Sequence, residues 1–241
     1  MEKRLTRKEK RIARQFNENI EKLTTPEPSL RVIKPLTINQ TNVFNFYDEN
    51  KNMVLMGSAG TGKTFLAIYL AMREILFTES SYKKLVIVRS CVPTRDIGFL
   101  PGDTKEKEAI YEIPYESIFN ELFNKKSAYS YFKNQNKLEF ISTSFIRGIT
   151  LSDCIVIVDE IQNFSFQELD SITTRVGKNC KIVFAGDFKQ SDLTKQKDGV
   201  FDFIDIIKEM KEFKFVEFDY KDIVRSGLVK SYIIMKEKMG K

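Results

Sequence analysis

The 241-residue sequence contains no histidine, and this one absence removes several kinds of chemistry. Without imidazole the chain can form no histidine general base, no Ser-His-Asp or Cys-His triad and no histidine metal site. Any catalysis must therefore rest on carboxylates, lysine, arginine and a bound metal ion.

Cysteines are few and widely spaced. Cys91, Cys154 and Cys180 follow no metal-binding spacing and no disulfide framework, and two of them lie in apolar, strand-like runs. We expect buried, reduced thiols.

The sequence also lacks an apolar run of transmembrane length and an N-terminal stretch like a secretory signal. We therefore expect a cytoplasmic protein with no membrane partner. A chain of 241 residues, 42% of them hydrophobic, can form one full α/β domain with its own core, or at most two small domains.

The net charge of +6 is concentrated at the start of the chain. Residues 1–14 hold seven lysines or arginines against two glutamates, which leaves only +1 for the remainder. Such a basic, helix-like arm can neutralise nucleic-acid phosphates, but a solvated terminus or an arm that packs on a neighbouring subunit fits equally well. A proline-containing linker follows at 24–29. We expect residues 1–33 to form this arm and linker, and 34–241 to form one domain.

Apolar, strand-like segments alternate with helix-like ones along that domain. The expected strands are 53–56, 84–89, 138–141, 154–159, 181–185 and 213–218, and the expected helices include 115–126, 199–211 and 227–238. Ser165 starts another helix, with Glu168 at the spacing of a capping box. Continuous β-branched runs between helices predict an α/β fold with a mostly parallel sheet and helices on both faces.

One glycine-rich segment fits the pattern G-x-x-x-x-G-K-[ST] at every fixed position. It lies between the strand at 53–56 and a helix-like run at 65–72, so successive N–H groups and a helix N-terminus would surround a phosphate chain. Lys63 would reach the β- and γ-phosphates, and the Thr64 hydroxyl would bind Mg²⁺. The expected nucleotide-binding residues of the loop are Gly57, Ser58, Ala59, Gly60, Thr61, Gly62, Lys63 and Thr64. This segment predicts a nucleoside triphosphate site.

Two acidic residues end the most hydrophobic strand. Asp159 would hold Mg²⁺ opposite Thr64, and Glu160 would activate the attacking water as catalytic base. The carboxyl ends of parallel strands are where such sheets bind ligands, which favours this role over two solvent-exposed acids.

Three more residues are candidates. Gln190 follows the strand at 181–185 by way of Gly186-Asp187, and it can orient the attacking water. Gln40 precedes the phosphate loop; its amide can recognise both hydrogen-bonding groups of adenine, although a Gln that caps a helix fits nearly as well. Arg225 follows the last strand and can neutralise charge on the transferred phosphoryl group, although surface arginines are common.

Taken in order, these motifs resemble the PhoH family, most closely the short PhoH-like proteins of bacteriophages. The resemblance runs from about Lys34 to Ile234, and its specific parts are Gly-Phe-Leu-Pro-Gly at 98–102, Arg-Gly-Ile-Thr-Leu at 147–151 and Asp-Glu-Ile-Gln-Asn at 159–163. It implies a RecA-like P-loop domain similar to one motor domain of superfamily 1 helicases, with ATP and Mg²⁺ as ligands, a cytoplasmic location and a role in RNA metabolism. It supports Gln40, Gln162, Gln190 and Arg225 as site residues. Ile149 and Ile161 depart from the family pattern.

Two functions fit these motifs. The first is an ATPase that acts on RNA or single-stranded DNA. Arg89, Arg95 and Arg147, with Phe99 nearby, could contact phosphates and bases, although structural pairing explains the arginines equally well. The second is an ATP-dependent switch or remodelling protein that acts on a host protein. A small-molecule kinase and a nuclease fit poorly.

The chain shows no second motor domain of the kind that a monomeric helicase contains. We therefore expect a homo-oligomeric ring, with a hexamer as one candidate, in which Arg225 enters the site of a neighbouring subunit.

Overall fold

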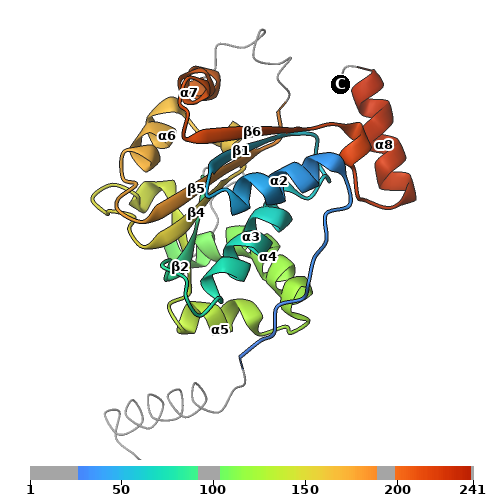
Figure 1. The fold of residues 1–241 in the computed structure, drawn as a ribbon. Coiled ribbons are helices and arrows are strands. Elements are labelled where there is room, and N and C mark those ends of the chain that lie inside the picture. The colour runs from blue at the N-terminus through green and yellow to red at the C-terminus, as the bar shows by residue number, and fades with distance from the viewer. Residues whose placement is uncertain (1–26, 92–103, 189–198, 240–241) are drawn as a thin grey trace, which may run out of the picture.

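A computed structural model describes residues 27–91, 104–188 and 199–239 (Figure 1). The basic arm at 1–14, the segment that holds Arg95 and Phe99, and Gln190 lie outside these ranges. Among the described residues, no helix combines the length and apolar character needed to cross a membrane.

Six strands form one sheet in which every described pairing is parallel, in the order β3-β2-β4-β5-β1-β6. They are β1 (Asn52–Gly57), β2 (Lys84–Arg89), β3 (Leu138–Ser142), β4 (Cys154–Asp159), β5 (Cys180–Gly186) and β6 (Phe213–Phe218). The expected α/β fold with a parallel sheet is confirmed.

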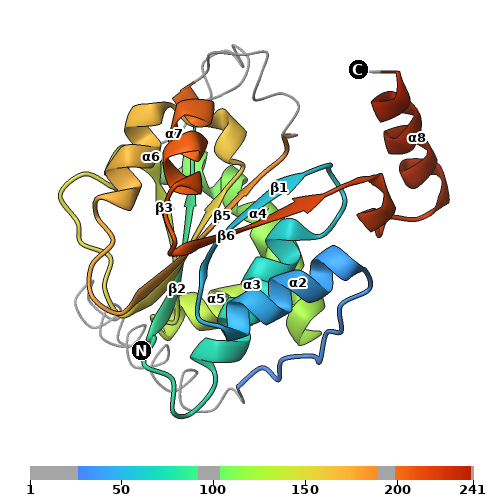
Figure 2. The same cartoon turned by 45° about the horizontal axis from the view of Figure 1, so that its top comes forward.

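Helices cover both faces of the sheet (Figure 2). One face carries α2 (Ile38–Asp48), α3 (Lys63–Ile75), α4 (Thr104–Phe123) and α5 (Ala128–Asn134), and the other carries α6 (Phe166–Thr173) and α7 (Gly199–Lys208). The last helix, α8 (Gly227–Lys238), projects beyond the edge formed by β6 (Figure 1). Short 3₁₀ helices are η1 (Thr143–Phe145), η2 (Ile161–Asn163) and η4 (Tyr220–Asp222).

The two cores explain why the central strands are mostly apolar. In β4, Ile155 and Ile157 pack under the α2–α5 face, while Val156 and Val158 pack under α6 and α7. Successive side chains of a strand point to opposite faces, so a sheet that is covered on both faces needs apolar residues at both.

The bounds of β2, β4, β6 and α8 match the expected ones, and the capping box of Ser165 and Glu168 is present. The expected helix at 115–126 is wrong in its start, because α4 begins at Thr104 and continues through Pro114. Proline lacks an N–H and usually ends a helix, which is why the sequence suggested a start after it. Buried Tyr115, Phe119 and Leu122 hold the later turns of α4 against the sheet. Helix α5 was not expected at all.

The cysteines agree with the sequence only in part. All three are free thiols, but only Cys154 is buried, since Cys91 and Cys180 are half-buried. Pairing of β4 with β5 puts Cys154 opposite Cys180, with their sulfur atoms 3.7 Å apart.

Strand order also sets the position of the site. Strand β5 lies between β1, which leads into the glycine-rich loop, and β4, which ends at the acidic pair. Because all these strands are parallel, the segments that follow them meet at one edge of the sheet.

Candidate active site

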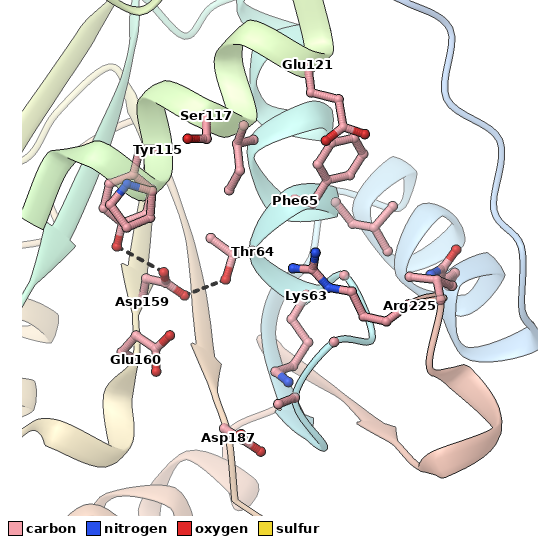
Figure 3. A pocket seen from close by; sticks show the side chains of 18 of the residues that line it. Lys63, Thr64, Phe65, Tyr115, Ser117, Glu121, Asp159, Glu160, Asp187 and Arg225 are labelled. Atoms are coloured by element: carbon pink, nitrogen blue, oxygen red, sulfur yellow. Dashed lines mark hydrogen bonds between the residues drawn. The ribbon is translucent and has the colours of Figure 1, made fainter. Parts of the chain in front are cut away.

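A pocket of about 750 Å³ opens at this carboxyl edge (Figure 3). Its floor is the glycine-rich loop and the first turn of α3, and its walls come from α4, from the segment before α2 and from the segment after β6. Its charged lining residues are Lys34, Lys63, Arg89, Glu121, Asp159, Glu160, Asp187 and Arg225. Many of the residues that the sequence singled out therefore lie in one cavity.

The glycine-rich loop turns through positive φ angles at Gly57, Gly60 and Gly62, which glycine adopts without strain. The loop ends where α3 begins, and the Lys63 side chain folds back over it. The Lys63 ammonium donates hydrogen bonds to the carbonyl oxygens of Gly57 and Ser58, both at 2.8 Å. Burial lowers the pKa of Lys63, and the carboxylates of Asp187, Glu160 and Asp159 act against this. The charge of Lys63 thus lies at the floor of the pocket.

Thr64 and Asp159 meet as the sequence predicted. The Thr64 hydroxyl donates to Asp159 Oδ1 at 2.7 Å, although 95 residues separate the two in the chain. Asp159 is 4% exposed. Burial raises the pKa of its carboxyl, and the charge of Glu160 adds to this, while the hydrogen bonds from Thr64 and Tyr115 oppose it. A hydroxyl and a carboxylate are hard oxygen donors of the kind that Mg²⁺ prefers, so these two residues fit that ion.

Glu160 lines the pocket next to Asp159, with its backbone in the left-handed region at φ +57°. This conformation is uncommon for a residue with a side chain, and such strain concentrates at functional sites. Gln162 holds the Glu160 carboxylate in place. Its amide N–H₂ donates to Glu160, and its amide oxygen accepts from the Asp187 N–H at 2.9 Å. Gln162 therefore bridges the end of β4 and the end of β5.

Asp187 lines the pocket directly after β5. Gln190 lies outside the described residues, so its role as a water-orienting residue stays a prediction.

Gln40 is 3% exposed and lies beside the glycine-rich loop. Its amide oxygen accepts from the Leu36 N–H at 2.8 Å, and its amide nitrogen donates to the Thr61 carbonyl at 3.1 Å. Gln40 thus ties the segment before α2 to the loop. One lone pair and one N–H of the amide remain beyond these bonds. Contact with adenine stays a prediction.

Arg225 lines the pocket of its own chain, above the glycine-rich loop (Figure 3). A side-chain carbon built at Gly60 would lie 2.9 Å from Arg225 Cγ, and the Val224 N–H donates to the Gly60 carbonyl at 3.1 Å. Buried Asp222 anchors this segment, since it accepts from the Asn39 amide at 2.7 Å. The structure therefore places Arg225 within reach of its own site.

The other arginines that the sequence singled out lie in different surroundings. Arg89 lies at the end of β2, where it is half-buried and lines the pocket, 5.7 Å from the ring centroid of Tyr111 and 5.9 Å from that of Tyr115. Arg147 is exposed in the loop after η1. Beside it Phe145 is 54% exposed, and the sequence did not single this residue out. Arg95 and Phe99 lie outside the described residues.

Tyr115, Asp222 and the α4 wall of the pocket were also missed at the level of sequence. The available signal was weak: Tyr111 and Tyr115 are spaced by one helical turn, and Asp222 opens the segment that contains Arg225. Neither pattern indicates which residue Tyr115 or Asp222 would contact.

Comparison with known proteins places this geometry in a family. The family model described as "PhoH-like protein" matches residues 32–237. The PhoH-like protein of Synechocystis sp. is 30% identical over 210 residues, which are 86% of this chain and 63% of that protein. The PhoH-like protein of Bacillus subtilis is 29% identical over 227 residues, which are 93% of this chain and 70% of that protein. The chain thus spans about three fifths of the length of the first of these relatives.

Among solved structures, the large terminase of a thermophilic bacteriophage superposes with a TM-score of 0.51 at 12% identity, covering 84% of this chain and 50% of the terminase. This likeness concerns the fold, which is the RecA-like α/β fold of P-loop proteins. The matched family model and the relatives show that the chain belongs to the PhoH-like protein family.

Proposed function

We propose that this protein is a Mg²⁺-dependent ATPase. The observation that carries the proposal is the convergence of Lys63, the Thr64–Asp159 pair and Glu160 in one pocket at the carboxyl edge of the sheet. A site with these groups can bind a nucleotide and can also activate water, which favours hydrolysis over simple binding.

Each group has a defined task in this proposal. The loop N–H groups and Lys63 hold the β- and γ-phosphates, and Thr64 and Asp159 hold Mg²⁺, which neutralises phosphate charge when it is bound. Glu160 accepts a proton from the attacking water. Gln162 keeps the Glu160 carboxylate oriented, because its amide is bonded to both Glu160 and the Asp187 backbone.

In this proposal Arg225 neutralises negative charge on the transferred phosphoryl group. Its position above Gly60 supports contact with phosphate in its own chain. We also propose that the protein assembles as a homo-oligomeric ring. In that ring the entry of Arg225 into a neighbouring site is the competing arrangement.

We propose RNA or single-stranded DNA as the partner that ATP hydrolysis serves. Exposed Phe145 and Arg147 support this, because an aromatic ring and a cation on one loop suit stacking with a base and contact with phosphate. They follow β3 and therefore lie at the same sheet edge as the pocket.

A second candidate function is ATP-dependent action on a protein partner. It is favoured by α8, which exposes apolar side chains on one helical row: Leu228 is 85% exposed, Tyr232 67% and Met235 58%. Contiguous exposed apolar surface of this kind often marks a protein contact.

ATP turnover measured alone, with RNA and with single-stranded DNA tests the proposal and separates the two functions. We expect nucleic acid to stimulate turnover, Phe145→Ala to reduce that stimulation, and Lys63→Ala to abolish turnover under all conditions. If neither RNA nor single-stranded DNA changes the turnover, action on a protein partner would be favoured. Turnover that survives in Lys63→Ala would contradict the ATPase site itself.

A further inference from the structure

We propose that Tyr115 is a positioning residue for the metal-binding carboxylate of Asp159. The inference rests on the proposed function, since it assigns a role at the same Mg²⁺ site. It adds a residue from α4, which neither the glycine-rich loop nor the acidic pair indicates.

The contact itself is direct. The Tyr115 hydroxyl donates to Asp159 Oδ2 at 2.9 Å, while the Thr64 hydroxyl donates to Asp159 Oδ1 at 2.7 Å. The two donors approach the carboxylate from different elements, α4 and α3 (Figure 3). Each oxygen of Asp159 is therefore assigned to one partner.

The ring of Tyr115 cannot easily move away from this bond. Its side chain is fully buried, it packs against Phe140 with ring centroids 5.9 Å apart, and it lies beside the Arg89 guanidinium. These contacts belong to the core under α4, so the hydroxyl is held in place by packing that does not depend on a ligand.

This arrangement has a consequence for metal binding. The bond from Tyr115 to Oδ2 keeps the carboxylate turned so that Oδ1 faces Thr64, and a carboxylate oxygen that accepts one hydrogen bond still has a lone pair for a metal ion. Mg²⁺ demands near-ideal octahedral geometry, so a carboxylate free to turn is a poorer ligand than one held in a single orientation. Groups that hydrogen-bond to a metal ligand in this way typically change metal affinity by about 10–100-fold when removed.

The test uses Tyr115→Phe, which removes the hydroxyl and keeps the ring. Binding of ADP and of a non-hydrolysable ATP analogue is measured by calorimetry over a series of Mg²⁺ concentrations and in EDTA. We expect the Mg²⁺ concentration for half-maximal enhancement of binding to rise about 10-fold or more, while affinity in EDTA and the melting temperature stay near those of the wild type.

Tyr111→Phe is the matched control. Tyr111 lies one turn earlier on α4 and also packs on Arg89, but its described contacts do not include Asp159. We expect wild-type Mg²⁺ dependence from this variant. In an Asp159→Asn background, Tyr115→Phe should produce no further change in Mg²⁺ dependence, because the carboxylate through which it acts is gone.

The outcomes separate cleanly. Unchanged Mg²⁺ dependence in Tyr115→Phe overturns the proposal. Equal loss of nucleotide affinity with Mg²⁺ and in EDTA overturns it too, because that pattern indicates general damage to the pocket. A further change in Mg²⁺ dependence in the Asp159→Asn background also overturns it, because Tyr115 would then act without the carboxylate. A wild-type protein that binds no nucleotide would instead contradict the proposed function.

Discussion

Glu160 combines an unusual backbone conformation with a carboxylate that faces the pocket. Its φ is +57°, and its carboxylate accepts a hydrogen bond from the Gln162 amide. We predict that Glu160→Gln retains binding of Mg²⁺ and nucleotide but lowers turnover by about 10²-fold or more, because the amide cannot accept a proton.

Turnover and equilibrium binding measured on the same preparation check this prediction. Glu168→Gln is a suitable control, since Glu168 caps α6 on the surface and should change turnover little. Wild-type turnover in Glu160→Gln would show that another group activates the water.

Lys181 is a buried cation near the start of β5, whereas the site lies at the carboxyl ends of the strands. Its side chain is 2% exposed; its ammonium donates to Glu74 at 3.0 Å and lies 3.8 Å from the ring centroid of Tyr47. Burial lowers the pKa of Lys181, and Glu74 acts against this. The ion pair therefore has a large desolvation cost to offset.

We predict that Lys181→Met changes the free energy of unfolding by less than about 1.5 kcal/mol, because Met fills the space without a charge and the Glu74 carboxylate left behind is 30% exposed and can be hydrated. Lys181→Ala should cost about 2–3 kcal/mol through the space it leaves. Chemical denaturation measures both.

The pH dependence of stability gives a second check on Lys181. The folded-state pKa lies below the ordinary value of 10.5, so the unfolded chain binds more protons between these two values. Wild-type stability should therefore rise with pH toward 10.5 relative to Lys181→Met, and parallel pH curves for the two proteins would show that the lysine carries no such penalty.

At the scale of elements, β6 lies very close to the junction between β1 and the glycine-rich loop. A side-chain carbon at Gly57 would lie 1.9 Å from the Phe218 carbonyl oxygen, and φ at Gly57 is +120°. The same carbonyl accepts from the Ser58 N–H at 3.3 Å. The end of β6 thus shapes the start of the loop.

We predict that Gly57→Ala destabilises the protein by about 3 kcal/mol or more and abolishes nucleotide binding, because β6 and the loop must separate. Gly148→Ala is the matched control. Gly148 also has a positive φ, +91°, but nothing lies within 4 Å of the added carbon, so only the backbone strain of about 1 kcal/mol should appear. Equal losses in the two variants would show that steric contact with Phe218 is unimportant.

At the scale of the whole molecule, charge is distributed unevenly along the chain. Residues 1–14 carry a net +5 of the total of +6. We predict that deletion of residues 1–14 weakens binding of RNA and reduces the dependence of affinity on salt, because fewer counterions are released from the nucleic acid.

Fluorescence anisotropy with labelled single-stranded RNA over a salt series measures both quantities. Replacing the seven lysines and arginines of this arm by glutamine controls for the loss of length and should reproduce the effect. Unchanged affinity at every salt concentration would assign the arm another role.

Local pattern was sufficient to identify the candidate site residues and most of the elements. The central strands contain continuous apolar runs, and the glycine-rich loop and the acidic pair are contiguous motifs, so their residues could be found without knowledge of the fold. The start of α4 was missed because local preference at Pro114 disagrees with the packing of Tyr115 and Phe119.

The sequence by itself therefore determined the fold class, the family resemblance and the candidate roles of Lys63, Thr64, Asp159 and Glu160, all of which follow from neighbouring residues. Only the tertiary structure decided that β5 separates β1 from β4, that Arg225 lies over its own Gly60, and that Tyr115 bonds to Asp159 across 44 residues. These contacts depend on strand order and on helix packing, which bring distant residues together. Local periodicity could not predict them, because it indicates only the face of a helix or strand on which each residue lies.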